Sequence, residues 1–159
     1  MAQFLSNSTT NSVVYSSGTW TTKVLPATQD VASSETYTSV PEFKIALGKY
    51  ERMLLKYRIH WAQNTTGRIK FKIDTPTVTA IHTAFNGVEP DNTALLGRTT
   101  GVDPIKEVDV AGTAGYIEAE MVIENDATAG DIDFQFGQMA SNAGPAQVLR
   151  GSYVEYRRF

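Results

Sequence analysis

Apolar and polar residues alternate strictly in several stretches of this chain, and the clearest stretch covers residues 130–138. Ile132, Phe134 and Phe136 fall on one side of an extended backbone, and two aspartates and a glutamine fall on the other. A period of two predicts a β-strand with one packed face and one wet face. A second stretch, residues 148–159, predicts a final strand that is held in a sheet.

The same alternation predicts strands near 43–47, 53–61, 69–73, 78–85, 105–110 and 116–124. Their β-branched and aromatic content agrees with this interpretation, and no segment has a helical period. The side chains expected to face inward are Phe43, Ile45, Leu47, Met53, Leu55, Tyr57, Ile59, Trp61, Ile69, Phe71, Ile73, Ile117, Ala119, Met121 and Ile123. Residues 86–104 are rich in Gly, Pro, Asp, Asn and Thr, which predicts a long loop of the kind that often carries function.

About eight short strands separated by turn signals predict an all-β fold, an antiparallel β-sandwich or jelly roll. We place this domain at residues 37–159. Residues 1–36 are rich in Ser and Thr and hold few large apolar side chains, which predicts an extended N-terminal arm with one or two short strands. Such an arm either lies along its own domain or adds a strand to a partner.

Two segments of the chain resemble each other. Residues 57–73 and 119–136 both have the form strand, turn and strand, so we interpret each as a hairpin. The outer face of the first is basic and that of the second is acidic. The resemblance is either a general property of sandwich hairpins or the way neighbouring subunits recognise one another. The charged residues concerned are Arg68, Lys70, Lys72, Asp131 and Asp133.

The charges of the chain exclude some partners. The net charge is −3, with +4 in residues 1–80 and −7 in residues 81–159. An acidic protein is a poor match for nucleic acid, which needs a concentrated basic surface. No apolar run approaches the roughly 20 residues of a membrane span, and no secretory signal is recognisable. The uneven charges either interleave on one folded body or bring a basic face of one subunit to an acidic face of another.

Candidates for chemistry all have a simpler structural interpretation. His60 and His82 are expected to be structural, and the chain has no cysteine, so neither a zinc site nor any other metal site or cofactor is predicted. Carboxylate pairs for glycoside hydrolysis (Glu118 with Glu120, Asp131 with Asp133) have the spacing of a wet strand face, and Asp126 with Asp131 matches no calcium loop. Four aromatic residues are candidates for a sugar-stacking platform, although core packing is expected for Trp61. They are Trp20, Trp61, Tyr153 and Tyr156.

From residue 37 onward the chain resembles small structural proteins of tailed bacteriophages. The resemblance covers about 120 residues and rests on four segments. They are residues 43–50 (FKIALGKY), 62–73 with its AQNTTG and KFKI parts, 136–144 (FGQMASNAG) and 149–157 (LRGSYVEYR), of which the last is the most specific. Gly137 stands where the family pattern has Ala.

This resemblance implies a jelly-roll domain without enzymatic activity that assembles as a homotrimer on the virion. It implies a capsid decoration (cement) protein, made in the host cytoplasm, whose partner on the capsid surface is the major capsid protein. The arm residues expected to contact the shell are Phe4, Val13, Val14, Tyr15 and Trp20, and the subunit contacts are expected at the five charged residues above. The alternative function is a fibre, spike or carbohydrate-binding domain that recognises a host-surface glycan.

Overall fold

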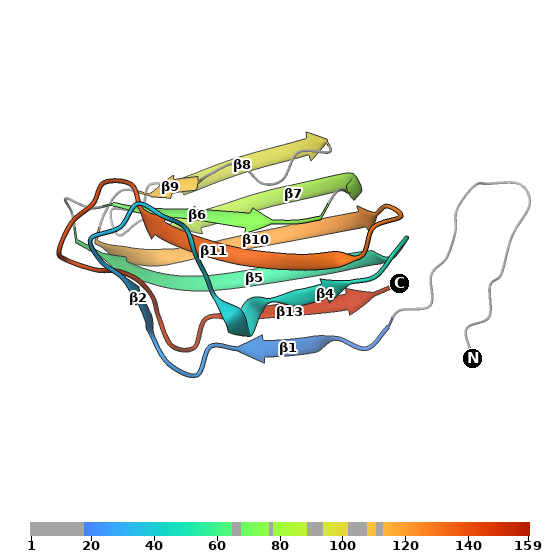
Figure 1. The fold of residues 1–159 in the computed structure, drawn as a ribbon, viewed down its shortest axis with the longest axis horizontal. Coiled ribbons are helices and arrows are strands. Elements are labelled where there is room, and N and C mark those ends of the chain that lie inside the picture. The colour runs from blue at the N-terminus through green and yellow to red at the C-terminus, as the bar shows by residue number, and fades with distance from the viewer. Residues whose placement is uncertain (1–17, 65–67, 77, 89–93, 102–107, 111–112) are drawn as a thin grey trace, which may run out of the picture.

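The computed structural model describes residues 18–64, 68–76, 78–88, 94–101, 108–110 and 113–159, and for 79–88, 94–101 and 108–110 it describes the backbone alone. In these ranges the chain forms two antiparallel sheets that face each other (Figure 1). The large sheet has the order β1 (Thr21–Val24), β13 (Tyr153–Arg158), β5 (Arg52–Gln63), β10 (Ala114–Asn125), β7 (Val78–Val88) and β8 (Ala94–Gly101), while β12 (Ala146–Val148) joins β5 to β2 (Gln29–Val31). The small sheet has the order β3 (Thr38–Ser39), β11 (Gly130–Gln138), β6 (Ile69–Asp74) and β9 (Val108–Val110), and β4 (Ile45–Leu47) also pairs with β11.

The order of the strands is that of a jelly roll. One sheet contains β1, β13, β5 and β10, and the facing sheet contains β4, β11, β6 and β9. The chain crosses between the sheets from β4 to β5, β5 to β6, β9 to β10, β10 to β11 and β11 to β13, which gives the interleaved pairing of two Greek keys. The strands β7 and β8 are inserted between β6 and β9 and extend the large sheet beyond β10. The predicted fold class is confirmed.

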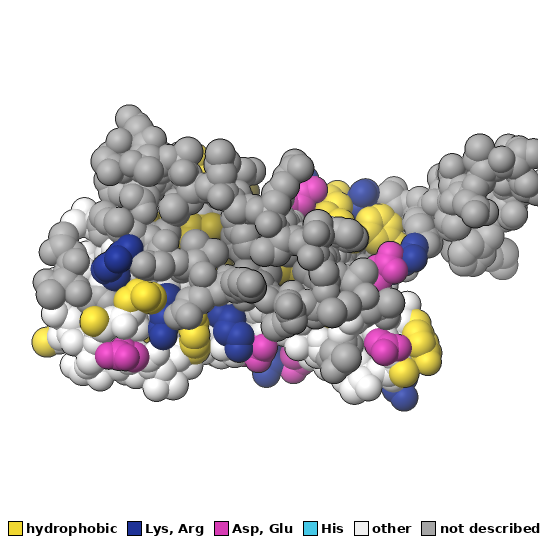
Figure 2. Space-filling model, turned by 90° about the horizontal axis from the view of Figure 1, so that it is seen from above, with side chains coloured by type: hydrophobic (Ala, Val, Ile, Leu, Met, Phe, Trp, Pro, Cys, Tyr) yellow, Lys and Arg dark blue, Asp and Glu magenta, His cyan; other side chains and the backbone are white. Residues whose placement is uncertain are grey.

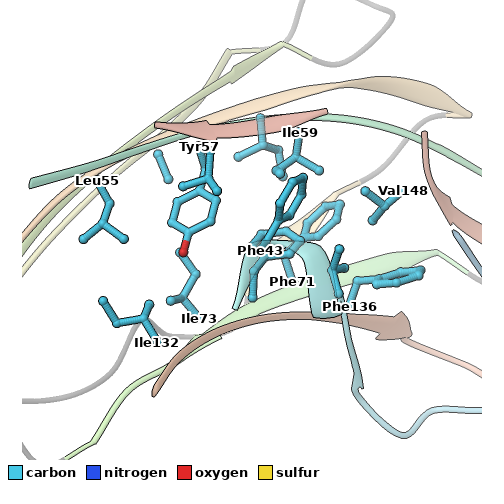
Figure 3. Packing of buried hydrophobic residues seen from close by; sticks show 14 of the residues in the cluster. Phe43, Leu55, Tyr57, Ile59, Phe71, Ile73, Ile132, Phe136 and Val148 are labelled. Atoms are coloured by element: carbon cyan, nitrogen blue, oxygen red, sulfur yellow. The ribbon is translucent and has the colours of Figure 1, made fainter. Parts of the chain in front are cut away.

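The core lies between the two sheets and contains all of the predicted inward-facing residues, together with others that were not predicted, such as Val40 and Val148. Phe134 is at its centre: its ring centroid lies 5.5 Å from that of Tyr57, 5.8 Å from Phe71 and 6.0 Å from Phe43. Figure 3 shows Leu55, Tyr57 and Ile59 of β5 pointing toward residues of β6 and β11. Trp61 is fully buried, as predicted.

The two similar segments are not hairpins, which corrects the prediction. In each, the first strand belongs to the large sheet and the second to the small sheet: β5 leads to β6, and β10 leads to β11. The equivalent strands pair with each other instead, β5 with β10 and β6 with β11. Because a strand that crosses between sheets buries the same alternate side chains as a strand in a hairpin, a period of two does not distinguish the two arrangements.

The predicted long loop at residues 86–104 is also corrected. The strand β7 continues to Val88, and β8 pairs with it from Ala94 opposite Val88 to Gly101 opposite Ile81. Residues 89–93 and 102–107 lie outside the described part. The strand β8 has two glycines and three other polar residues, so its extended conformation comes from backbone pairing with β7 rather than from an apolar period.

The described part of the predicted arm lies along its own domain. The strand β1 pairs with β13, and β2 pairs with β12. Leu25 and Val31 reach the core. The backbone at Gly18 passes so close to β13 that a Cβ there would lie 2.5 Å from the Arg158 carbonyl oxygen. Residues 1–17, with four of the five predicted shell contacts, lie outside the described residues.

The most specific segment of the resemblance, residues 149–157, forms the joint between β12 and β13 and most of β13, and both strands pair with β5. Gly151 has φ +87°, a conformation that favours glycine. Ser152 is fully buried, and its hydroxyl accepts a hydrogen bond from the His60 backbone N–H at 2.9 Å and donates one to the Leu149 carbonyl at 2.8 Å. This segment is therefore a structural joint, which places Tyr153 and Glu155 beside β5.

No helix among the described residues combines the length and the apolar character that a membrane crossing needs.

Candidate functional site

The five charged residues predicted as subunit contacts lie together on the outer face of the small sheet. Lys70 and Lys72 belong to β6, Arg68 directly precedes this strand, and Asp131 and Asp133 belong to the neighbouring strand β11. In the register of the two strands, residue 72 lies opposite residue 135 and residue 74 lies opposite residue 133. The face therefore has a basic end and an acidic end.

Several of these side chains already have partners in the same chain. Lys72 Nζ lies 3.3 Å from Asp74 Oδ1, and Lys44 Nζ lies 3.3 Å from Asp131 Oδ2. Asp133 accepts hydrogen bonds from the Ser39 hydroxyl and from Gln135 Nε2. Basic and acidic side chains also lie next to one another over the described part of the side of the molecule that carries β8 (Figure 2). Contact of the five residues with a second copy stays a prediction.

The outer face of the large sheet carries a ladder of ion pairs between β5 and β10. Arg52 Nη2 lies 2.9 Å from Glu124 Oε1, Lys56 Nζ lies 3.4 Å from Glu120 Oε2, and Arg58 Nη1 lies 3.3 Å from Glu118 Oε1. All of these side chains are about one third to one half exposed, so each pair stabilises the fold by only about 0–1 kcal/mol. Glu118 and Glu120, weighed above as a catalytic pair, are each held by a base.

Beside this ladder the outer face has a shallow depression of about 210 Å³, which we call the outer hollow. Its floor is the backbone of β5 and β10. Its side-chain walls are Lys56, Arg58, Glu118, Glu120, Tyr153 and Glu155. Strand pairing arranges them in two rows across β13, β5 and β10: Glu155, Lys56 and Glu120 in one, and Tyr153, Arg58 and Glu118 in the other.

The two basic side chains of the outer hollow, Lys56 and Arg58, each lie over an aromatic ring. Lys56 Nζ lies 5.6 Å from the centroid of the Trp20 ring, and Arg58 Cζ lies 5.1 Å from that of Tyr116. Cation–π contacts of this kind limit the motion of long basic side chains. Lys56, Arg58 and Glu155 could not be recognised as site residues from the sequence, because their proximity depends on the order of three strands.

The four aromatic residues weighed as one platform lie in different places. Trp61 is in the core, and Tyr156 packs against the core. Trp20 is 39% exposed. Arg157 Cζ lies 5.2 Å from the centroid of the Trp20 ring and 4.9 Å from that of the Phe159 ring. Of the four, Tyr153 alone lines the outer hollow.

The remaining candidates are not assembled into a site. His60 is half-buried beside the Tyr116 ring, and the side chain of His82 lies outside the described residues. Asp126 accepts a hydrogen bond from the Ala127 N–H, while Asp131 is paired with Lys44. Among the described residues, no group of three or more His, Asp or Glu side chains is placed to hold a metal ion.

Tyr57 is a titratable group of the core, and its pKa is strongly shifted. Burial raises the pKa of its hydroxyl far above the ordinary value, and the negative charge of Asp133 raises it further. Figure 3 shows the hydroxyl pointing from β5 toward the small sheet, and it has no hydrogen-bond partner among the described residues. The group is therefore neutral at physiological pH and plays a packing role.

No protein-family model matches the chain, and no curated protein matches it. Solved structures that resemble it include that of the infectious bursal disease virus Gt strain (7% identity, TM-score 0.25, 99% of this chain and 42% of that chain). Another is the crystal structure of the infectious bursal disease virus VP2 subviral particle (10% identity, TM-score 0.25, 99% of this chain and 45% of that chain). This chain spans less than half the length of those proteins, and a likeness this weak carries no argument about function.

Proposed function

We propose that this chain is a non-enzymatic structural protein of a virion, a capsid decoration (cement) protein that binds as a homotrimer to the capsid exterior and stabilises the shell. Its partners are two further copies of itself and the major capsid protein, and nucleic acid and membrane are not among them. This proposal extends the resemblance to small structural proteins of tailed bacteriophages.

The observation that carries the proposal is that residues 18–20, which directly follow the polar segment 1–17, are held against the domain. Gly18 is packed against the Arg158 carbonyl, and the Trp20 ring is held by Lys56 and Arg157. A jelly roll with a polar segment rooted at one end suits a body that sits on a surface and reaches outward. In this proposal Phe4, Val13, Val14 and Tyr15 are apolar anchors on the shell, and Trp20 is the root of the arm.

Stabilisation by such a protein is a consequence of mass action. A ligand that binds the expanded shell and not its precursor lowers the free energy of the expanded state in proportion to its differential affinity. Three arms on one trimer raise the overall affinity without strong individual contacts, because the second and third binding events become intramolecular.

The proposed homotrimer is tested by the mass of the full chain in solution, measured by light scattering. We expect three times the chain mass of 17.4 kDa. Because the arm is assigned to the shell, a variant that lacks residues 1–17 should also be a trimer, with three times its own shorter chain mass. A monomer at all concentrations would contradict the proposed assembly.

The subunit contacts are tested by charge reversal on the small sheet. Lys72→Glu should dissociate the trimer, and adding Asp133→Lys should restore it, if basic and acidic ends of neighbouring copies meet. Glu124→Lys on the large sheet is the matched control and should leave the mass unchanged. If all three variants have the mass of the wild-type trimer, the five charged residues do not form the subunit interface.

A further inference from the structure

We propose that the outer hollow is a binding site for one ring of a neutral sugar in a glycan. This inference does not rest on the proposed virion role, because it follows from the outer face of the large sheet alone. The hollow is smaller than the roughly 300–1,000 Å³ of a site for a drug-sized ligand, so it suits a single ring.

The dimensions of the hollow follow from strand geometry. Residues two apart on a strand lie about 7 Å apart, and three neighbouring strands span about 10 Å. The two rows of side chains therefore enclose an area of the size of one six-membered ring with its substituents. The Tyr153 ring stands at one corner, where it can pack against the C–H face of a sugar.

The polar groups around the hollow match a ring of hydroxyls. Each sugar hydroxyl both donates and accepts, so it needs acceptors and donors within a short distance of each other. Carboxylates and bases alternate across the hollow in the row Glu155, Lys56 and Glu120. Among the described residues, the side chain of Glu155 forms no ion pair or hydrogen bond, which leaves its carboxylate open to a ligand.

The hollow is also held in shape before any ligand arrives. Lys56 is fixed by Glu120 and Trp20, and Arg58 is fixed by Glu118 and Tyr116. Binding therefore costs less side-chain entropy than binding to free surface lysines and arginines.

The charge of the hollow selects among glycans. Two bases face three carboxylates, which gives a net charge of −1. Phosphate-rich polymers and acidic sugars are disfavoured by this excess of negative charge, whereas neutral rings carry no such penalty. The affinity for a neutral ring should also change little with salt, unlike that of a polyanion.

The test uses the purified full chain and ligand-observed NMR with glucose, galactose, mannose and N-acetylglucosamine, followed by an array of neutral and anionic glycans. We expect at least one neutral ring to bind, and the array to favour glycans that contain it. Tyr153→Ala and Glu155→Gln should each weaken binding at least tenfold. Glu124→Gln, on the same face outside the hollow, should bind as the wild type does.

Tyr153→Phe keeps the ring and separates loss of the site from loss of the fold, and a thermal melt of each variant checks folding. This variant should retain more binding than Tyr153→Ala. The proposal is overturned if no neutral glycan binds, if the Tyr153 and Glu155 variants bind as tightly as the wild type, or if anionic glycans bind best.

Discussion

Ser152 offers the sharpest test of the joint between β12 and β13. Its hydroxyl is fully buried and accepts the His60 backbone N–H at 2.9 Å. In Ser152→Ala that N–H loses its partner. The two carbonyls near the hydroxyl keep theirs, because the Leu149 carbonyl accepts from the Ser152 N–H and the His60 carbonyl accepts from the Leu149 N–H.

The expected cost is therefore that of one buried N–H left without a partner, about 1–3 kcal/mol. For a chain of this size, each kcal/mol lowers Tm by roughly 2–4 °C. Urea unfolding followed by circular dichroism measures the loss, and Ser141→Ala, at an exposed serine, is the matched control. A loss below about 0.5 kcal/mol, the level of ordinary surface substitutions, would refute this role of the hydroxyl.

Three further predictions concern the same body. Gly151→Ala should cost about 1–2 kcal/mol in urea unfolding through backbone strain alone, because φ is +87° and no atom lies within 4 Å of the added Cβ; an unchanged midpoint would contradict this. Phe134→Ala should cost about 3–5 kcal/mol, since it removes the ring that contacts three others; a loss near 1 kcal/mol would mean that the core collapses around the site. Above the ordinary tyrosine pKa of about 10, the unfolded chain releases the Tyr57 proton while the folded chain retains it, so the free energy of unfolding should fall by up to about 1.4 kcal/mol per pH unit. Tyr57→Phe should lessen this alkaline loss, and an equal loss in both proteins would contradict the raised pKa.

The faces of the strands could be predicted from the sequence, whereas their neighbours could not. Alternation identified the inward residues of β5 and β11 because each strand buries one side. It did not reveal that β5 and β6 lie in different sheets, or that β8 is a strand, since both facts depend on pairing between distant segments. The outer hollow could not be predicted for the same reason. Lys56, Glu118 and Glu155 lie close together only because β13, β5 and β10 are neighbours in the sheet.

The uneven charge of the two halves has a local explanation on the large sheet. Bases of β5, from the basic half, stand opposite carboxylates of β10, from the acidic half. The charges of the two halves therefore interleave on this face of one body, the first of the two interpretations that the sequence left open.

The central proposal, that the chain decorates and stabilises a capsid, is tested most directly by sedimentation with the capsid shells to which it is proposed to bind. The full chain is mixed with expanded shells and with precursor shells, and a variant lacking residues 1–17 serves as the control. We predict that the full chain sediments with expanded shells, does not sediment with precursor shells and raises the temperature at which expanded shells break. The shortened variant should bind neither kind of shell and leave that temperature unchanged. Equal binding to both kinds of shell, or none to either, would contradict the account.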